Sequence, residues 1–185
     1  MPADDLVATD NPIPDTVQRL ISQVDSDGLL TLQLVPGPVV LPCNGEVLIR
    51  VEAAPVNPAD IRAMLCGLAP DDLVYTLDGD RFRVSGQLSA AQLEGQAGRV
   101  GQVLPLGNEG CGTVIATGQD AASRALLGRR VAIAAGCLYA SHAVVPASDC
   151  IVLPDACSAE QGAGAWINPL TALAMVETMK RDGHD

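Results

Sequence analysis

The chain has 185 residues, of which 48% are hydrophobic and 18% charged, and its 22 acidic residues outnumber 11 Lys and Arg for a net charge of −11. This apolar content predicts a folded globular domain and argues against disorder. A net charge of this sign repels phosphate backbones and anionic membrane surfaces. Neither nucleic acid nor a membrane is therefore an expected partner.

The N-terminus and the cysteines indicate the compartment. The first ten residues, MPADDLVATD, carry acids where a signal peptide carries basic residues, and no apolar run approaches the ~18 residues of a membrane span. The six cysteines form no C-x-x-C pair, and the chain has only two histidines. This pattern is typical of reduced, buried thiols and not of a metal site. We expect a cytoplasmic protein without a bound metal.

Strands are predicted for the first part of the chain, after a polar leader over residues 1–16. The segments TVQRLISQV and LLTLQLV flank a DSDG turn at residues 25–28, a combination that predicts an antiparallel hairpin. In EVLIRVEAAPV, residues 46–56, apolar residues alternate with charged ones. This alternation is typical of a half-buried strand.

A short helix and an insertion follow. Asn57 precedes Pro58, and Asp60 places an acid in the first turn, which predicts a helix from Pro58 to about Leu68. Residues 69–104 are interpreted as an insertion on top of a simpler core. It is expected to contain a hairpin about residues 78–79 and a short helix near residues 89–99.

The remaining chain is predicted to contain short strands and then two helices. The segments GTVIATG, GRRVAIAAG, LYASHAVVP and CIVLP are separated by Gly, Pro and Asp, which favours a closed or nearly closed barrel. Ser158 and Gln161 form a capping-box pattern, and a second helix is expected from Asn168 to about Arg181. The predicted fold class is mainly β with short helices.

Three segments, in this order, carry a resemblance to a known family: VEAAPVNPADI (51–61), PLGNEGCGTV (105–114) and LPDACSAEQGAGAWINPLTALAMVE (153–177). Together they resemble the N-terminal, GroES-like catalytic domain of medium-chain dehydrogenase/reductases. The Asn-Pro-x-Asp and Asn-Pro-Leu-Thr forms are similar to the quinone oxidoreductase and 2-enoyl reductase branch, which does not use zinc.

The resemblance implies a domain organisation. A partly closed GroES-like β-barrel is expected over residues 17–157, with the insertion at about 69–104. Residues 158–185 would form a helical connection toward a nucleotide-binding Rossmann domain. The G-x-G-x-x-G fingerprint of such a domain does not occur in residues 1–185. We therefore expect a fragment, a truncated product or one member of a split enzyme, inactive alone.

The same resemblance bears on metal chemistry. Where zinc-dependent relatives carry ligands, this chain has Asn57, Asn108 and the pair at residues 167–168. Neutral amides are poor zinc ligands, because catalytic zinc takes Cys, His or acidic side chains. Ala59 also stands where those relatives use a hydroxyl to relay a proton. Zinc-dependent alcohol oxidation is therefore not expected.

The chemistry implied by the resemblance is hydride delivery from NADPH to a quinone or an enoyl substrate. The residues expected along the substrate and nicotinamide cleft are Asn57, Asp60, Asn108, Glu109, Asn168 and Thr171. Some relatives place a proton-donating tyrosine shortly after the Asn-Pro helix, where this chain reads CGLAP. The catalytic donor is therefore absent or lies elsewhere, with Tyr75 a candidate.

Structural interpretations stand beside these functional ones. Asn57 and Asn168 each precede a proline, so helix capping alone would explain both. Glu109 could be a buried, ion-paired structural acid, and Tyr75 could be a packing residue.

An alternative function is a stand-alone GroES-like binding or assembly module without catalysis. In either case an exposed apolar face over residues 158–182 would favour self-association or a Rossmann-type partner.

Overall fold

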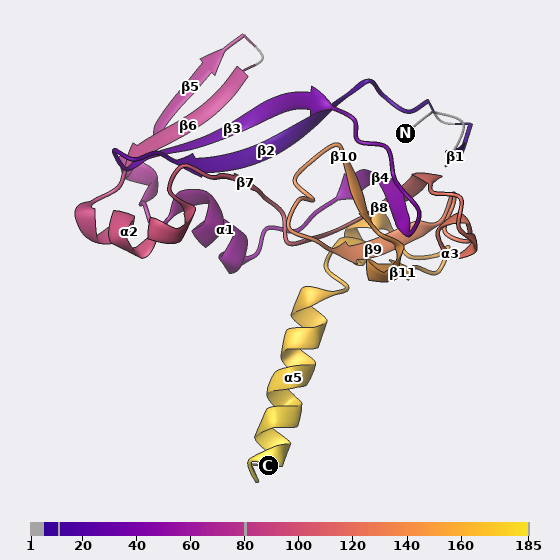
Figure 1. Cartoon of the computed structure of the whole chain (residues 1–185). Helices are drawn as coiled ribbons and strands as arrows, with labels where there is room; N and C mark the ends of the chain where they lie inside the picture. Colours follow the sequence, from indigo (N-terminus) through magenta and orange to yellow (C-terminus); the bar gives the residue numbers. More distant parts are fainter. Residues whose placement is uncertain (1–5, 11, 80, 185) are drawn as a thin grey trace.

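Two antiparallel sheets carry most of the fold (Figure 1). The computed structural model describes residues 6–10, 12–79 and 81–184. The first sheet has the order β10-β4-β8-β9-β11, with β1 added on β8, and the second has the order β5-β6-β3-β2-β7. Along these orders each sheet keeps two open ends. The predicted class, mainly β with short helices, is confirmed.

The strands of the first sheet are β1 (Val7–Ala8), β4 (Glu46–Ala53), β8 (Glu109–Thr117), β9 (Arg130–Ala134), β10 (His142–Pro146) and β11 (Cys150–Val152). Those of the second sheet are β2 (Thr16–Val24), β3 (Leu29–Pro38), β5 (Val74–Asp78), β6 (Arg81–Gln87) and β7 (Val103–Pro105). Of the predicted polar leader, residues 1–5 and 11 lie outside the described residues, while β1 pairs with the far end of β8.

The main core lies on the first sheet, where the apolar residues of β4, β8 and β9 meet. Val47, Ile49, Val114, Val131 and Ile133 are all fully buried in it. Each such side chain contributes about 1.5–3 kcal/mol when it leaves water. Alternation along β4 therefore holds the strand in one register, since a slip by one residue would expose this set.

The three glycines of the GNEGCG segment are needed for different reasons. Gly107 has a φ of +95°, which suits glycine at the turn before β8. Gly110 and Gly112 lie inside β8, and a Cβ at Gly112 would collide with the carbonyl oxygen of Arg50 on β4. Close strand approach thus explains two of these glycines, and a turn explains the third.

The predicted N-terminal hairpin is confirmed by the pairing of β2 with β3. At its turn the Asp25 carboxylate accepts hydrogen bonds of 2.9 Å from the backbone N–H groups of both Asp27 and Leu29. Gly28 supplies the left-handed conformation, with a φ of +81°.

The α-helices are short except for the last. They are α1 (Pro58–Leu65), α2 (Ala90–Gly95), α3 (Ala121–Arg124), α4 (Ala159–Ala163) and α5 (Ile167–Arg181), and three 3₁₀ turns cover Pro70–Asp72, Ala97–Arg99 and Ala147–Asp149. Helix α1 ends before the predicted Leu68, because Cys66 and Gly67 adopt left-handed conformations with φ of 52° and 82°.

The segment at 69–104, interpreted from the sequence as an insertion, contributes strands to the second sheet. Its predicted hairpin and helix both form, as β5–β6 and α2. In addition, β6 pairs with β3, and Arg99 donates hydrogen bonds of 2.8 Å to the Ala63 carbonyl on α1 and the Ser22 hydroxyl on β2. These contacts tie the segment to three other elements.

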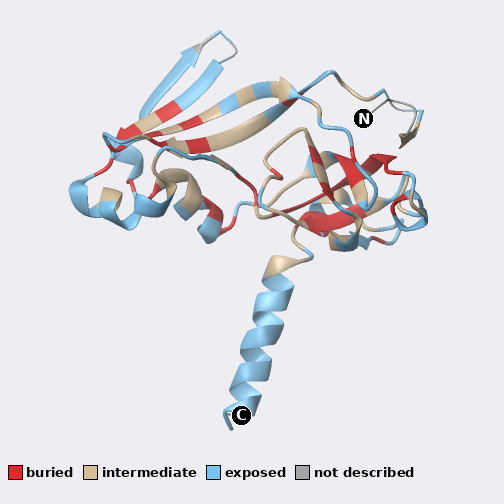
Figure 2. Ribbon diagram, viewed as in Figure 1, coloured by how far each residue is buried: buried red, intermediate tan, exposed pale blue. Residues whose placement is uncertain are grey.

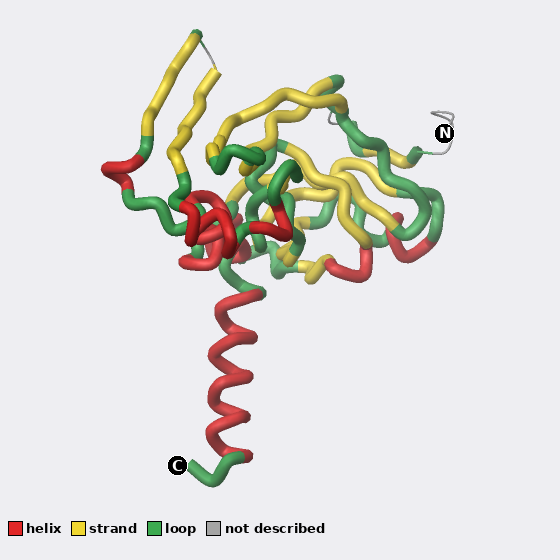
Figure 3. The backbone as a smooth tube through the Cα atoms, turned by 60° about the vertical axis from the view of Figure 1, so that its left-hand side comes forward, coloured by secondary structure: helices red, strands yellow, loops and turns green. Residues whose placement is uncertain are grey.

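Helix α5 extends away from both sheets (Figures 1 and 3). None of its residues is buried, and Figure 2 shows it exposed along almost its whole length. Its large exposed apolar side chains are Leu170, Leu173, Met175, Val176 and Met179. Within the part of the chain that the structure describes, no helix is long and apolar enough to cross a membrane.

Candidate functional site

The three segments that carry the family resemblance converge where α1, β8 and α5 begin. Asn57 caps α1, as predicted, and its backbone N–H donates a 2.9 Å hydrogen bond to the Asp60 carboxylate. Both residues are buried, and Asp60 is only 1% exposed. This reciprocal capping box holds the start of α1 in place.

Glu109, the first residue of β8, lies buried at the centre of this convergence, with an exposure of 1%. Its Oε1 accepts a 2.9 Å hydrogen bond from Asn57 Nδ2, and its Oε2 accepts a 2.8 Å hydrogen bond from the backbone N–H of Ile167. No cation among the described residues pairs with it. The expected ion pair is therefore replaced by two N–H donors, one from each helix start.

Asn168 extends the same chain of hydrogen bonds. Its Nδ2 donates a 2.9 Å hydrogen bond to Oδ1 of Asn57. Asn168 does not cap α5, because the residue at the N-cap is Trp166. The capping interpretation thus holds for Asn57 and is wrong for Asn168. We name Glu109, Asn57 and Asn168 the amide–carboxylate chain.

A second pair of polar residues lies beside this chain. Asp60 Oδ1 accepts hydrogen bonds from both the backbone N–H (3.2 Å) and the side-chain Nδ2 (2.8 Å) of Asn108. Asn108 is half-buried. The bond from Nδ2 to Asp60 is the one side-chain hydrogen bond that Asn108 makes in the described structure.

Tyr139 joins the cluster, and the sequence analysis did not single it out. Its hydroxyl donates a 2.8 Å hydrogen bond to the Pro55 carbonyl oxygen. Burial, together with the nearby carboxylates of Asp60 and Glu109, raises the pKa of Tyr139 to about 12. In the sequence, only the rarity of tyrosine, which occurs twice in the chain, could have drawn attention to Tyr139.

The structure does not join two other expected residues to this cluster. Thr171 is exposed, and its hydroxyl donates a 2.8 Å hydrogen bond to the Ile167 carbonyl within α5. Tyr75 is 60% exposed on β5, the outer strand of the second sheet. Neither side chain hydrogen-bonds to Asn57, Asp60, Asn108, Glu109 or Asn168 in the described structure.

The chemistry available to this cluster is orientation and hydrogen bonding. The two buried carboxylates accept hydrogen bonds from N–H groups. Asn108 and Asn168 each use one side-chain N–H in the described structure, so each can still form further hydrogen bonds through its amide. No group of three or more His, Cys, Asp or Glu side chains in the described ranges could hold a metal ion. A separate pocket of about 410 Å³ lies between β2 and β10, and Tyr139 forms part of its wall.

The open antiparallel sheets form a GroES-like domain. The model of the alcohol dehydrogenase GroES-like domain matches residues 43–155. The chain belongs to this family, within the medium-chain dehydrogenase/reductases. A comparison with curated proteins returned no match.

Solved structures share this fold. A protein from Mesorhizobium loti assigned as an NADPH:quinone reductase is 26% identical, with a TM-score of 0.64 over 94% of this chain and 46% of its own. A mycobacterial protein solved with NADPH is 26% identical, with a TM-score of 0.56 over 88% of this chain and 40% of its own. The quinone oxidoreductase of Coxiella burnetii is 21% identical, with a TM-score of 0.57 over 88% and 45%. The chain thus spans less than half the length of each.

Proposed function

We propose that this chain is the substrate-side catalytic domain of an NAD(P)H-dependent oxidoreductase that reduces a quinone or an enoyl compound without zinc. It turns over only together with a dinucleotide-binding domain. The observation that carries the proposal is the amide–carboxylate chain, because hydrogen bonds join Asn57 to both Glu109 and Asn168, and Asn57 and Asn168 are amides that by resemblance stand where zinc-dependent relatives carry ligands. Family membership and the likeness to the two proteins at 26% identity support the reaction class.

The donor set of this cluster does not suit zinc. Both polar atoms of the Asn57 amide already have protein partners, Glu109 and Asn168. A metal at this point would have to displace these hydrogen bonds and would gain a neutral amide as a ligand, which zinc disfavours. Zinc therefore has no part in the proposed reaction.

The same residues suit a nicotinamide. A carboxamide needs both a donor and an acceptor, and the exposed amide of Asn168 offers both after its single bond to Asn57. When bound, NADPH supplies the hydride. The chain's own contribution is orientation: Glu109 holds Asn57, and Asn57 holds Asn168. A rigid amide at this point positions the ring without taking part in proton transfer.

The test is an assay of the natural polypeptide that carries this sequence, with NADPH oxidation followed at 340 nm. A benzoquinone and a crotonyl thioester serve as acceptors, and zinc content is measured by mass spectrometry. We expect NADPH oxidation with one acceptor class, no zinc at stoichiometric level and no inhibition by a chelator. The 185-residue chain alone is expected to show no turnover.

Matched variants separate this site from general stability. Asn168→Ala should raise the KM for NADPH, while Asn44→Ala, a change at an exposed turn whose side chain accepts a hydrogen bond from the backbone N–H of Gln119, should not. Stoichiometric zinc with chelator-sensitive alcohol oxidation would overturn the zinc-free assignment. Failure with both acceptor classes in a folded polypeptide would favour a binding or assembly module.

A further inference from the structure

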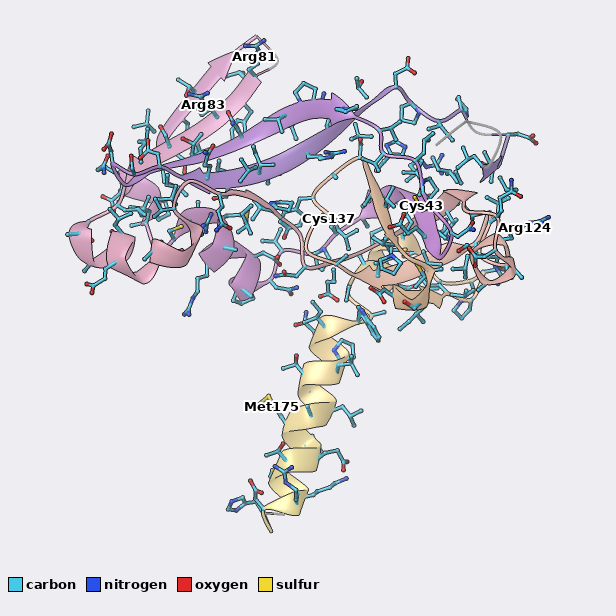
Figure 4. All side chains as sticks on the ribbon, viewed as in Figure 1. Cys43, Arg81, Arg83, Arg124, Cys137 and Met175 are labelled. Atoms are coloured by element: carbon cyan, nitrogen blue, oxygen red, sulfur yellow. The ribbon has the colours of Figure 1, made fainter. Side chains whose placement is uncertain are left out.

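A pocket of about 410 Å³ lies between the two sheets, where β2 and the residues after β3 face β4 and β10. Most of its wall is apolar and includes Val17 on β2, Leu48 on β4 and Val144 on β10. Figure 4 labels another wall residue, Cys137, between the two sheets. The volume falls within the range of about 300–1,000 Å³ that is typical of small-molecule sites, which are mostly apolar with a few polar groups.

The pocket is separate from the polar cluster at the start of α5. Neither the amide–carboxylate chain nor Asp60 nor Asn108 contributes to its wall. Tyr139 is the residue common to both, because it lines the pocket while its hydroxyl reaches the Pro55 carbonyl oxygen. A ligand in this pocket therefore occupies a second site, whatever reaction the polar cluster supports.

Arg19 supplies a positive charge on the wall of the pocket. It is half-buried on β2, and its Nη2 donates a 3.0 Å hydrogen bond to the Pro38 carbonyl oxygen. The guanidinium lies beside Gly37, where a Cβ would stand 3.5 Å from Nη1. No acidic side chain in the described ranges forms an ion pair with it. Its remaining N–H groups are thus available to a carboxylate, which a guanidinium can bind through two parallel hydrogen bonds.

Glu46 is an acid on the same wall. Its Oε2 accepts a 2.8 Å hydrogen bond from the backbone N–H of Cys43, in the turn before β4. Glu46 starts β4, and Arg50 follows four residues later on that strand, a span of about 13 Å. Arg50 is the residue opposite His142 on β10. The acid and the imidazole therefore stand at opposite ends of this strand pair.

The end of the pocket at Cys137 and His142 is electropositive. Burial raises the pKa of the Cys137 thiol, and the positive charge of Arg19 acts on it in the opposite direction. Burial also lowers the pKa of His142, and the positive charge of Arg50 lowers it further. The charges that act on these two wall residues are thus both positive. This local field attracts an anionic group, against the general repulsion from a chain of net charge −11.

We propose that this pocket binds a small molecule that has an apolar body and one carboxylate. The carboxylate pairs with Arg19, and the body lies against Leu48 and Val144. The body also covers Val40, a wall residue that is 54% exposed. Contact with these side chains removes apolar surface of both partners from water, which favours binding. The bidentate ion pair then fixes the orientation of the ligand.

The first test measures the binding of probe molecules to the 185-residue chain by isothermal titration calorimetry. Octanoate represents an aliphatic acid and 2-naphthoate an aromatic acid, and 1-octanol and 2-naphthol are their neutral counterparts. We expect the Kd of at least one acid to lie below about 1 mM. The corresponding alcohol should bind at least about tenfold more weakly, because it lacks the charge that pairs with Arg19. Absence of binding for both acids, or equal binding of acid and alcohol, overturns the proposal.

A charge variant tests the role of the guanidinium. Arg19→Gln should raise the Kd of the acid at least about tenfold and leave binding of the alcohol unchanged. Arg124→Gln on α3 is the matched control (Figure 4), because Arg124 is exposed, lies outside the pocket wall and changes the net charge by the same amount. Thermal denaturation shows whether both variants are folded. An equal loss of affinity in the two variants contradicts the assignment to Arg19.

A second test locates the ligand. Val40→Asp adds an acid to the wall and should raise the Kd of the bound acid at least about fivefold. Val74→Asp on β5, where the side chain is similarly exposed at 61%, lies outside the pocket and should not. In backbone NMR of the unchanged chain, the shifts caused by the acid should concentrate at Val39, Ala143 and Val144, which line the pocket. Shifts that concentrate on α5 instead, or equal effects of the two Asp variants, overturn the proposal.

Discussion

Asn57 and Glu109 are separated by 52 positions in the chain and joined by a hydrogen bond of 2.9 Å between Nδ2 and Oε1. Both side chains are buried. The second carboxylate oxygen of Glu109 holds the backbone N–H of Ile167 at the start of α5. One acid therefore connects the start of α1, the start of β8 and the start of α5.

Replacement of this acid tests the connection. Glu109→Gln keeps the shape of the side chain but turns one acceptor oxygen into an NH₂ group that faces an N–H donor. We expect the free energy of unfolding in urea to fall by about 1–3 kcal/mol, because a buried donor loses its acceptor. Glu94→Gln, an exposed control on α2, should change it by less than about 0.5 kcal/mol. Equal effects of both variants would contradict the role of Glu109.

Gly112 provides a test of close packing between strands. In Gly112→Ala the new Cβ would collide with the Arg50 carbonyl oxygen on β4, and we expect a loss of about 1–3 kcal/mol in the free energy of unfolding. Gly95→Ala is the matched control, because nothing lies within 4 Å of its Cβ position at the end of α2. It should be neutral or stabilise by about 0.4–1 kcal/mol. Thermal denaturation of both variants checks the contrast.

Truncation of an apolar side chain should lower the free energy of unfolding strongly in the core and only slightly on α5. Ile133 is fully buried on β9, so Ile133→Ala should cost about 2–5 kcal/mol in unfolding free energy through lost burial and a cavity. Leu173 is 56% exposed on α5, and Leu173→Ala should change this free energy by less than about 0.5 kcal/mol. A large loss in Leu173→Ala for the 185-residue chain would mean that α5 packs against the domain.

Asp120 should make a contribution to the stability of the fold that is lost in acid. Hydrogen bonds from the backbone N–H groups of Gly45 (2.7 Å) and Ser123 (2.9 Å) lower the pKa of Asp120 to about 2 from an ordinary 3.8. Because the folded-state pKa is below the unfolded one, the carboxylate stabilises the fold above pH 3.8. That contribution disappears as the pH falls through about 2.

The titration can be observed directly. Carbon-detected NMR should show the Asp120 carboxyl group titrating with a midpoint near 2. Asp120→Asn should remove part of the loss of stability between pH 4 and 2, whereas Asp155→Asn, at an exposed residue without a hydrogen bond in the described structure, should not. A midpoint at the ordinary value would disprove the effect of the two N–H donors.

Much of the local structure could be predicted, because its causes are local. The Asp25 turn, the Asn57 cap and the Ser158 capping box each depend on side chains that bond within three or four residues. Apolar alternation identified β4 for the same reason. The errors occurred where distant contacts intervene, as at Asn168, which bonds to Asn57 instead of capping its own helix.

Some residues of the candidate site could likewise be predicted from the sequence, and others could not. Asn57, Asp60, Asn108, Glu109 and Asn168 were all expected along one cleft by resemblance, and they do form one hydrogen-bonded group. Tyr139 was missed because its strand-like surroundings give no sign that its hydroxyl reaches Pro55, 84 positions earlier. Tyr75 was considered on residue type alone, which carries no information about distance in space.

The sequence by itself determined the element types, the turns, the family and most residues of the polar cluster, because these depend on short-range conformational preferences and on recognisable segments. Only the tertiary structure decided which donors satisfy Glu109, how the 69–104 segment joins the second sheet and which strand edge stays open. These features depend on how elements far apart in the chain pack together. That packing is a sum of many small contacts, and no short segment encodes it.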